Sequence, residues 1–287
     1  MTEEKTQNAL EIQRKLELRI RDLCEKNASA EELQKAYDEF HIFLLKYGVR
    51  GKLPQDFLYK NSLSPIDNLF LEKIGRGKSV LEIGLGDGYF LIECARKGDL
   101  ASGIDISDVV VQRSIAMFER EAVNAPIKLG EARSLAFPKE TFDFVVSKDL
   151  VEHLPEADLQ VHLREAWRVL KPEGCYLLWT SSRLLGHTSL GTHLKEYSLS
   201  EIMQELKKAK FEPVIVSLFI FLIFGSIKNV TNPHVTSFLF VYEKMLERLF
   251  HILRIQIQNP IIYLVVPPIC IAAYKLESQT VFKESDN

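Results

Sequence analysis

Three closely spaced glycines form the strongest chemical signal in the chain. They are Gly84, Gly86 and Gly88, in the segment VLEIGLGDGYF, which reads as a buried strand, a turn and the start of a helix. Glycine permits a tight turn and lets a ligand approach the backbone closely. A dinucleotide-binding GxGxxG pattern would place its third glycine at position 89, where Tyr89 stands instead. The pattern is ExGxGxG, with Glu82 on the strand, and it disfavours a nicotinamide dinucleotide site.

A carboxylate stands at the end of the next predicted strand. Asp105 closes the segment LASGID, 21 residues after Gly84. A carboxylate at this place can accept hydrogen bonds from both hydroxyls of a ribose. The alternative role for Asp105 is that of a helix cap or turn residue ahead of Ser107. The glycine turn upstream favours the ribose interpretation.

The elements that must position these groups alternate between strands and helices in the middle of the chain. The predicted strands are SVLEIG, LASGID, FDFVVS and CYLLWTS, and amphipathic helical segments separate them. This alternation predicts an α/β fold with a parallel sheet that helices cover on both faces. Ser64, followed by Pro65 and Asp67, marks one helix start, and Ser198 with Glu201 forms a capping box at another.

The composition is typical of a soluble globular protein. The 287 residues are 46% hydrophobic and 26% charged, with a formal net charge of -3. This excludes a disordered chain, and the weak net charge disfavours a nucleic-acid partner held by bulk electrostatics. The start of the chain is charged and helical rather than a signal peptide, so we expect a cytoplasmic protein. The cysteines lack CxxC spacing, so we expect reduced, buried thiols; they are Cys24, Cys94, Cys175 and Cys270.

We predict three parts along the chain. Residues 1–62 form an N-terminal helical extension that is solvated and partly packed. Residues 63–213 form the α/β core. Residues 214–287 form C-terminal strands with an inserted amphipathic helix, and they belong to the same domain as the core.

The last third is the most apolar part of the chain. Residues 214–227 carry no charge but are too few to span a bilayer as a helix. Residues 238–253 place apolar side chains at helical spacing, which predicts a core-facing helix inserted before the last strand. The alternatives are a lid over a hydrophobic substrate, or a membrane-surface helix that gives residues 214–254 a peripheral membrane contact.

Together these segments resemble class I S-adenosylmethionine-dependent methyltransferases of the small-molecule type. VLEIGLGDGYF resembles the family's first motif and GIDIS its second; GEARSLAFPKETFDFVVSKDLVEHLPE resembles the third and fourth, and LREAWRVLKPEGCYLLWT a helix-and-strand signature. The resemblance covers about residues 75–213 and the final strand near 270–275. It implies a Rossmann-like, doubly wound sheet of seven strands, mostly parallel with an antiparallel last strand, and S-adenosyl-L-methionine as the cofactor.

The resemblance also implies which residues hold the cofactor. The glycine turn would hold the methionine part, Asp105 the ribose hydroxyls, and Ile106 would pack on the adenine. Glu131 stands where the family usually has Asp facing the adenine amino group, and Ala132 would offer its backbone N–H. Glu82, Ser147 and Lys148 would border the methionine end, where Lys148 would pair with the cofactor carboxylate or point into solvent. The predicted cofactor-binding residues are Glu82, Gly84, Leu85, Gly86, Gly88, Asp105, Ile106, Glu131, Ala132, Ser147 and Lys148.

Methyl transfer to a hydroxyl benefits from a general base near the ends of the fourth and fifth strands. The candidates are Asp149, His153, His187 and His193, and we predict catalytic roles for Asp149, His153 and His193. His193 comes first, because the segment THLKEYSLSEIMQELKKAKFEP resembles a His-containing loop that borders the substrate in small-molecule methyltransferases. The alternative is a solvent-exposed loop histidine.

The segment DLVEH raises the question of a metal ion. Asp149, Glu152 and His153 stand at i, i+3 and i+4 and would share one face of a helical turn. DLVEH is similar to the ExxEH motif that ubiquinone-biosynthesis O-methyltransferases and small-RNA end methyltransferases use for a divalent metal, with Asp in place of the first Glu. A Glu-His pair is also common in metal-free relatives, so we predict a packing and hydrogen-bonding role and no metal. A metal site would draw in His187 or His193.

The sequence therefore predicts an enzyme that transfers a methyl group from S-adenosylmethionine to a small, hydrophobic or lipid-linked acceptor, at oxygen. The segment SKDL stands where exocyclic-amine methyltransferases carry an Asn/Asp-Pro-Pro-aromatic motif. The alternatives are an RNA or protein methyltransferase, and a non-catalytic cofactor-binding interaction protein.

Overall fold

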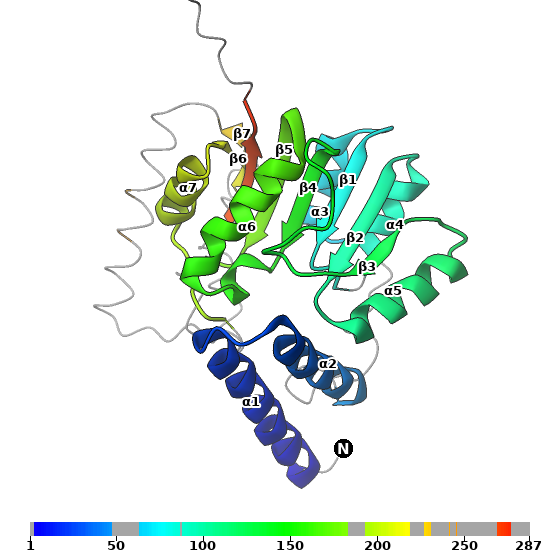
Figure 1. Ribbon diagram of the computed structural model, residues 1–287, viewed down its shortest axis with the longest axis vertical. Helices are drawn as coiled ribbons and strands as arrows, with labels where there is room; N and C mark the ends of the chain where they lie inside the picture. The colour runs from blue at the N-terminus through cyan, green and yellow to red at the C-terminus, as the bar shows by residue number, and fades with distance from the viewer. Residues whose placement is uncertain are drawn as a thin grey trace, which may run out of the picture.

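The computed structural model is an α/β protein built around one mixed sheet (Figure 1). It describes residues 3–47, 63–86, 88–182, 193–218, 227–230, 241, 245 and 269–276. The strands are β1 (Ser79–Ile83), β2 (Leu100–Asp105), β3 (Ile127–Leu129), β4 (Phe142–Lys148), β5 (Leu170–Thr180), β6 (Glu212–Leu218), β7 (Ile227–Val230) and β8 (Ile269–Tyr274). The helices are α1 (Glu3–Glu25), α2 (Ala30–Tyr47), α3 (Pro65–Ile74), α4 (Tyr89–Arg96), α5 (Asp108–Arg120), the 3-10 turn η2 (Val151–His153), α6 (Glu156–Val169) and α7 (Leu199–Lys208).

The sheet order is β3-β2-β1-β4-β5-β8-β6-β7. The first five strands of this order pair in parallel, whereas β8 is antiparallel to both β5 and β6. The predicted Rossmann-like sheet of seven strands with an antiparallel last strand is confirmed. The short strand β7 adds an antiparallel edge that the sequence analysis did not expect. It follows β6, which takes up the first residues of the uncharged 214–227 stretch.

Helices cover both faces of the sheet, as the alternation of elements predicts. One apolar core joins α3, α4 and α5 to residues such as Val80 and Val146. A second core joins α6 and α7 to residues such as Leu81 and Val145 on the opposite face. Neighbouring residues of one strand thus enter different cores, because successive side chains of a strand point to opposite faces.

The predicted helix starts and cysteine states are confirmed. The Ser64 hydroxyl accepts a hydrogen bond from the Asp67 backbone N–H at 3.1 Å, and the Asp67 carboxylate accepts one from the Ser64 N–H at 2.8 Å. Ser198 and Glu201 form the same capping box at α7. The cysteines are free and buried. Most of the predicted inserted helix at 238–253 lies outside the described residues; of its predicted stripe the structure describes Met245, which is exposed.

The helices α1 and α2 lie side by side at one end of the sheet (Figure 1). They share a small apolar core, against which Ile106 and Leu194 pack. Asp38 of α2 accepts hydrogen bonds from the Ser107 hydroxyl at 2.6 Å and from the Val109 N–H at 3.2 Å, at the start of α5. On the other side, Arg21 of α1 donates to the backbone carbonyl of His193 at 2.5 Å. These contacts fasten the pair of helices to the core at two places.

Candidate functional site

A cavity of about 710 Å³ lies where β1, β2 and β4 end. Here the strand order changes direction, since β2 and β3 lie on one side of β1 and β4 lies on the other. Ligands of open α/β sheets bind in the crevice outside such a switch point. Most of the predicted site residues line this cavity: Gly84, Leu85, Gly86, Asp105, Ile106, Glu131, Ala132, Lys148, Asp149 and His153. Glu82, Gly88, Ser147 and His193 do not line it, and His187 lies outside the described residues.

The glycine turn after β1 forms one wall of the cavity. Gly84 has φ 79° and Gly86 has φ 55°, a left-handed region that disfavours residues with a Cβ atom. A Cβ atom on Gly86 would meet nothing within 4 Å, so a ligand has room beside this turn. Gly88 has a different role from the predicted one. It caps α4 with φ 72° and packs against Ser114, away from the cavity.

Asp105 holds this turn in place. One carboxylate oxygen accepts the Leu85 N–H at 2.9 Å, and the other accepts the Ser107 N–H at 2.9 Å. Burial raises the pKa of this carboxyl, while the backbone donors and the nearby His41 oppose that shift. Each oxygen keeps further lone-pair capacity. The predicted turn role and the predicted ribose role are therefore compatible, and the first is observed.

Arg133 organises the wall after β3. It forms ion pairs with Glu131 and, at 2.8 Å, with Asp158. The carboxylate that we expected to face the adenine amino group thus has a cationic partner within the protein. Ala132 lines the cavity beside it and is 8% exposed.

Lys148 differs from both expectations, since it neither points into solvent nor lies free for a ligand carboxylate. Its ammonium group lies 2.7 Å from Asp67 Oδ1, 3.1 Å from Glu82 Oε1, and 4.4 Å from the centre of the Phe90 ring. Burial alone would lower the pKa of Lys148, but the two carboxylates raise it overall. Glu82 is fully buried behind the cavity wall, so its predicted contact with the methionine end is replaced by this ion pair. Ser147 is also fully buried and bonds to Tyr176.

Asp149 stands at the other side of the cavity, directly after β4. It has φ 49°, and its N–H donates to the Trp179 carbonyl at 3.0 Å. Asp149 is an exposed residue that lines the cavity. The surrounding protein nevertheless raises the pKa of its carboxyl group to about 7. Desolvation is the larger cause, and the charge of Glu152 is the second. A carboxyl group with such a pKa can take up a proton near neutral pH.

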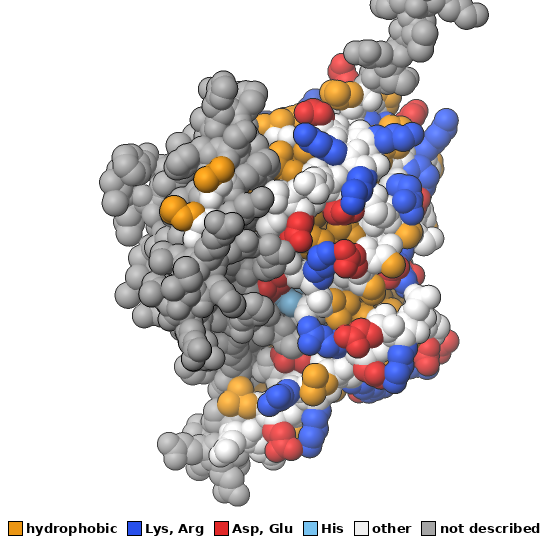
Figure 2. Space-filling model, turned by 90° about the vertical axis from the view of Figure 1, so that its left-hand side faces the viewer, with side chains coloured by type: hydrophobic (Ala, Val, Ile, Leu, Met, Phe, Trp, Pro, Cys, Tyr) orange, Lys and Arg blue, Asp and Glu red, His pale blue; other side chains and the backbone are white. Residues whose placement is uncertain are grey.

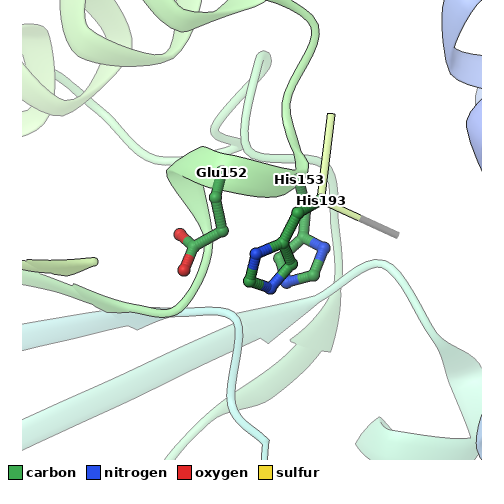
Figure 3. Close-up of side chains that lie close together, drawn as sticks. All are labelled: Glu152, His153 and His193. Atoms are coloured by element: carbon green, nitrogen blue, oxygen red, sulfur yellow. The ribbon is translucent and has the colours of Figure 1, made fainter. Parts of the chain in front are cut away.

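The prediction that Asp149, Glu152 and His153 share one face of a helical turn is wrong. Asp149 precedes η2 in a left-handed conformation, so the three residues do not follow one helical turn. The structure instead groups Glu152, His153 and His193, whose donor atoms lie within 4.8 Å of one another. Figure 3 shows the two imidazole rings close together; their centres are 4.7 Å apart.

The carboxylate of Glu152 already has protein partners. Its oxygens accept hydrogen bonds from Thr180 Oγ1 at 2.7 Å and from the Ser181 hydroxyl at 3.2 Å. Its backbone carbonyl accepts the Leu194 N–H at 2.8 Å. Glu152 thereby ties the end of β5 and the loop that carries His193 to η2. This agrees with the predicted hydrogen-bonding role of Glu152.

His193 lies behind His153 rather than in the cavity wall. Its Nδ1 lies 2.8 Å from Glu196 Oε1. Burial lowers the pKa of His193, but the Glu196 hydrogen bond and the charges of Glu152, Glu196 and Asp149 raise it overall. Of the two predicted histidines that the structure describes, His153 is therefore the one that can meet a ligand.

Sequence analysis named no cavity residue on α2 or α3. Tyr37, Phe40 and His41 of α2 and Ile66 and Asp67 of α3 line the cavity. Their sequence signals are the amphipathic pattern of the two helices and, for Asp67, its capping position, and neither signal points to a ligand. The cavity is thus completed by the segments that the family resemblance covers least.

Charged side chains of both signs are interspersed over the described part of the face in Figure 2. None of the described helices is long and apolar enough to cross a membrane.

Comparison with known proteins identifies the domain. Residues 80–174 match a family of methyltransferase domains. The chain carries a class I S-adenosylmethionine-dependent methyltransferase domain. Over 126 residues it is 32% identical to a ubiquinone biosynthesis O-methyltransferase of Azorhizobium caulinodans, covering 43% of this chain and 48% of that protein. Over 151 residues it is 30% identical to human EEF1A lysine methyltransferase 2, covering 48% of this chain and 61% of that protein.

A solved structure supports the fold of this methyltransferase domain. A methyltransferase from Methanosarcina mazei matches with a TM-score of 0.50 and 18% identity, over 76% of this chain and all of that one. At this identity the match speaks for the fold alone. The chain spans about half to three fifths of the length of the two relatives described above.

The cavity of the domain fits S-adenosylmethionine, the cofactor of the family. The open space beside Gly86 admits a ligand against the glycine turn, and Asp105 stands at the end of β2. Acidic side chains outnumber basic ones in the lining: Asp67, Asp105, Glu131, Asp149 and Asp158 against Arg133 and Lys148. This excess suits a cofactor of net positive charge, whose sulfonium and ammonium groups outnumber its single carboxylate.

Proposed function

We propose that this protein transfers a methyl group from S-adenosylmethionine to an oxygen atom of a small, apolar acceptor. One observation carries the proposal: a single cavity joins the glycine turn and Asp105 on one side to Asp149 and His153 on the other. In this proposal the first side of the cavity holds the nucleoside and the second side supplies the group that accepts a proton. The likeness to ubiquinone biosynthesis O-methyltransferases supports oxygen as the acceptor atom.

In this proposal, S-adenosylmethionine supplies an electrophilic methyl group when it is bound. The turn at Gly84 and Gly86 holds the amino-acid part, and Asp105 accepts the ribose hydroxyls. Lys148 stays with its two carboxylates and keeps that end of the cavity rigid. Positioning of this kind supplies much of the rate enhancement of a group transfer.

Asp149 acts as the general base toward the acceptor hydroxyl. Its pKa of about 7 balances proton affinity against ionisation near neutral pH. His153 lines the same region and would orient the acceptor, while His193 supports His153 from behind. We therefore keep all three predicted residues in the site and give Asp149 the base role in place of His193.

We expect an apolar acceptor because apolar side chains line part of the cavity. Leu33, Phe40, Leu154 and Trp179 contribute to this lining, together with Tyr37. Such a wall binds a hydrocarbon or aromatic group and leaves orientation to a few polar side chains. A peripheral membrane contact of residues 214–254 was one alternative from the sequence and would suit a lipid-like acceptor; most of these residues lie outside the described residues.

A second candidate is methylation of a protein lysine side chain. The 30% identity to EEF1A lysine methyltransferase 2 and the acidic excess of the cavity favour it. Incubation of the protein with methyl-labelled S-adenosylmethionine and fractions of a cell extract separates the two. Label in the organic-extractable fraction supports the small apolar acceptor, and label on lysine in the protein fraction supports the second candidate. Binding of cofactor without transfer to any fraction would leave the non-catalytic alternative.

Calorimetry tests the cofactor site directly. We expect wild-type protein to bind S-adenosylmethionine and not NAD. Asp105→Asn should weaken binding roughly ten- to hundredfold, since hydrogen bonds to a charged group are lost. Asp99→Asn is the matched control, because Asp99 is 6% exposed against 8% for Asp105 and accepts a backbone N–H from Lys78 at the other end of β2. Equal affinities in the two variants would contradict the ribose assignment.

The pH profile of the reaction tests the base. We expect kcat/KM to rise with pH up to about 7 and then to level off, because Asp149 must be ionised. Asp149→Asn should lower the rate roughly 10²- to 10⁴-fold and remove the inflection. An inflection that survives in the variant would assign the base to another group.

A further inference from the structure

A chain of buried hydrogen bonds crosses the core behind the cavity. His162 of α6 has its Nδ1 3.0 Å from the Ala132 carbonyl oxygen and its Nε2 2.9 Å from the Tyr176 hydroxyl. The Tyr176 hydroxyl lies 2.6 Å from Ser147 Oγ. His162, Tyr176 and Ser147 are each fully buried. Tyr176 belongs to an apolar core that also contains Val145 and Leu163.

The direction of each hydrogen bond follows from the chemistry of the groups. A carbonyl oxygen only accepts, so Nδ1 of His162 carries the proton and donates to Ala132. Burial lowers the pKa of His162 to about 4, so the ring is neutral and its Nε2 can only accept, from Tyr176. The Tyr176 oxygen in turn accepts from Ser147. Both ring nitrogens of His162 are thus satisfied, as a buried polar side chain requires.

The two ends of this chain lie at opposite sides of the cofactor cavity. Ala132 follows β3 and lines the cavity where adenine is expected. Ser147 is followed directly by Lys148 and Asp149, which line the cavity where the methyl group and the acceptor are expected. The predicted contact of Ser147 with the methionine end therefore becomes an indirect one, through the position of its strand.

We propose that His162 and Tyr176 are positioning residues that hold the Ala132 loop in register with the end of β4, and that they thereby set the recognition of adenine. This inference rests on the proposed function. With its carbonyl fixed by His162, Ala132 presents its N–H to a ring nitrogen of adenine that accepts a hydrogen bond. Hypoxanthine carries a hydrogen on the equivalent ring nitrogen and would place a donor against a donor.

The test compares binding of S-adenosylhomocysteine and S-inosylhomocysteine by calorimetry. We expect wild-type protein to bind the adenosyl compound at least tenfold more tightly than the inosyl compound. The Ala132 N–H gains a hydrogen bond in the first complex and is left unpaired in the second. Tyr176→Phe removes a hydroxyl without changing the ring and should reduce this preference threefold or more. A general loss of stability would weaken both compounds alike and leave their ratio unchanged.

Tyr197→Phe is the matched control. Tyr197 belongs to the same apolar core and is 1% exposed, and its hydroxyl has no hydrogen-bond partner among the described residues. We expect the wild-type ratio in this variant. A wild-type ratio in Tyr176→Phe as well would overturn the inference alone. Failure of wild-type protein to bind S-adenosylhomocysteine would overturn the proposed function and the inference with it.

A second pair of variants decides the matter if Tyr176→Phe does not fold. His162→Asn keeps a side-chain N–H that can donate to the Ala132 carbonyl, whereas His162→Leu has none. We expect His162→Asn to retain most of the adenosyl preference and His162→Leu to lose it. Equal ratios in the two variants would overturn the inference.

Discussion

Acidification should destabilise this protein in part through one residue, His162. The side chain is fully buried, and burial lowers its pKa from the ordinary value of 6.5 to about 4. Between these values the unfolded chain binds a proton that the folded protein does not bind. The free energy of unfolding therefore falls as the pH falls through this window. Each pH unit between these two pKa values is worth about 1.4 kcal/mol, so the full loss is about 3.5 kcal/mol.

Urea unfolding of wild-type protein and His162→Asn at pH 7 and pH 4.5 measures this contribution. The variant lacks the ring nitrogen that accepts the Tyr176 hydrogen bond, so it should be the less stable protein at pH 7. It also has no imidazole to protonate, so its deficit should shrink by about 2–3 kcal/mol at pH 4.5. Other acid-sensitive groups titrate in both proteins and cancel in the difference. A deficit that stays constant or grows on acidification would refute the burial argument.

His193 offers a control of opposite sign. Its pKa is raised above the ordinary value by Glu196 and the neighbouring carboxylates, although burial alone would lower it. The stability that it contributes is fully present below the unfolded pKa and is lost as the pH rises through the folded pKa. His193→Asn should therefore cost more stability at pH 5 than at pH 8. The two histidine variants thus differ in the sign of their pH dependence, which a general loss of packing would not produce.

Two further substitutions test the walls of the cavity. Lys148→Met should lower the free energy of unfolding by roughly 3 kcal/mol, because it leaves the carboxylates of Asp67 and Glu82 without their shared cation. Thermal unfolding at neutral pH measures this loss, and an unchanged midpoint would contradict the ion-pair role of Lys148. Gly103→Ala should cost about 1–3 kcal/mol and weaken cofactor binding, because its Cβ atom would lie 2.4 Å from Leu85 Cδ2 in the glycine turn. Wild-type binding in a folded Gly103→Ala protein would show that the turn adapts.

The sequence alone predicted the parts of the fold that depend on local pattern. Alternating strands and helices predicted the doubly wound sheet, because side-chain periodicity follows directly from backbone geometry. For the same reason, the glycine turn and Asp105 could be placed at the ends of neighbouring strands. In the structure the Asp105 carboxylate accepts a hydrogen bond from the Leu85 N–H of this turn at 2.9 Å. The capping boxes were also legible, since a cap involves residues only three positions apart.

The sequence did not predict the contacts of side chains whose partners lie far away along the chain. Lys148 at the end of β4 could not be assigned, because its partner Asp67 lies 81 positions away, on helix α3. The shared face of Asp149 and His153 assumed a helical turn that the left-handed backbone at Asp149 breaks.

What the sequence by itself determined is the order of the elements and the place of the nucleoside turn, which follow from short-range periodicity and from the conformations that glycine permits. Only the tertiary structure decided which polar groups meet. The contact of α2 with the cavity and the hydrogen bonds from Ala132 through His162 to Tyr176 join segments from separate elements. Their formation depends on how α2 and α6 pack around the sheet, and no local pattern specifies that packing.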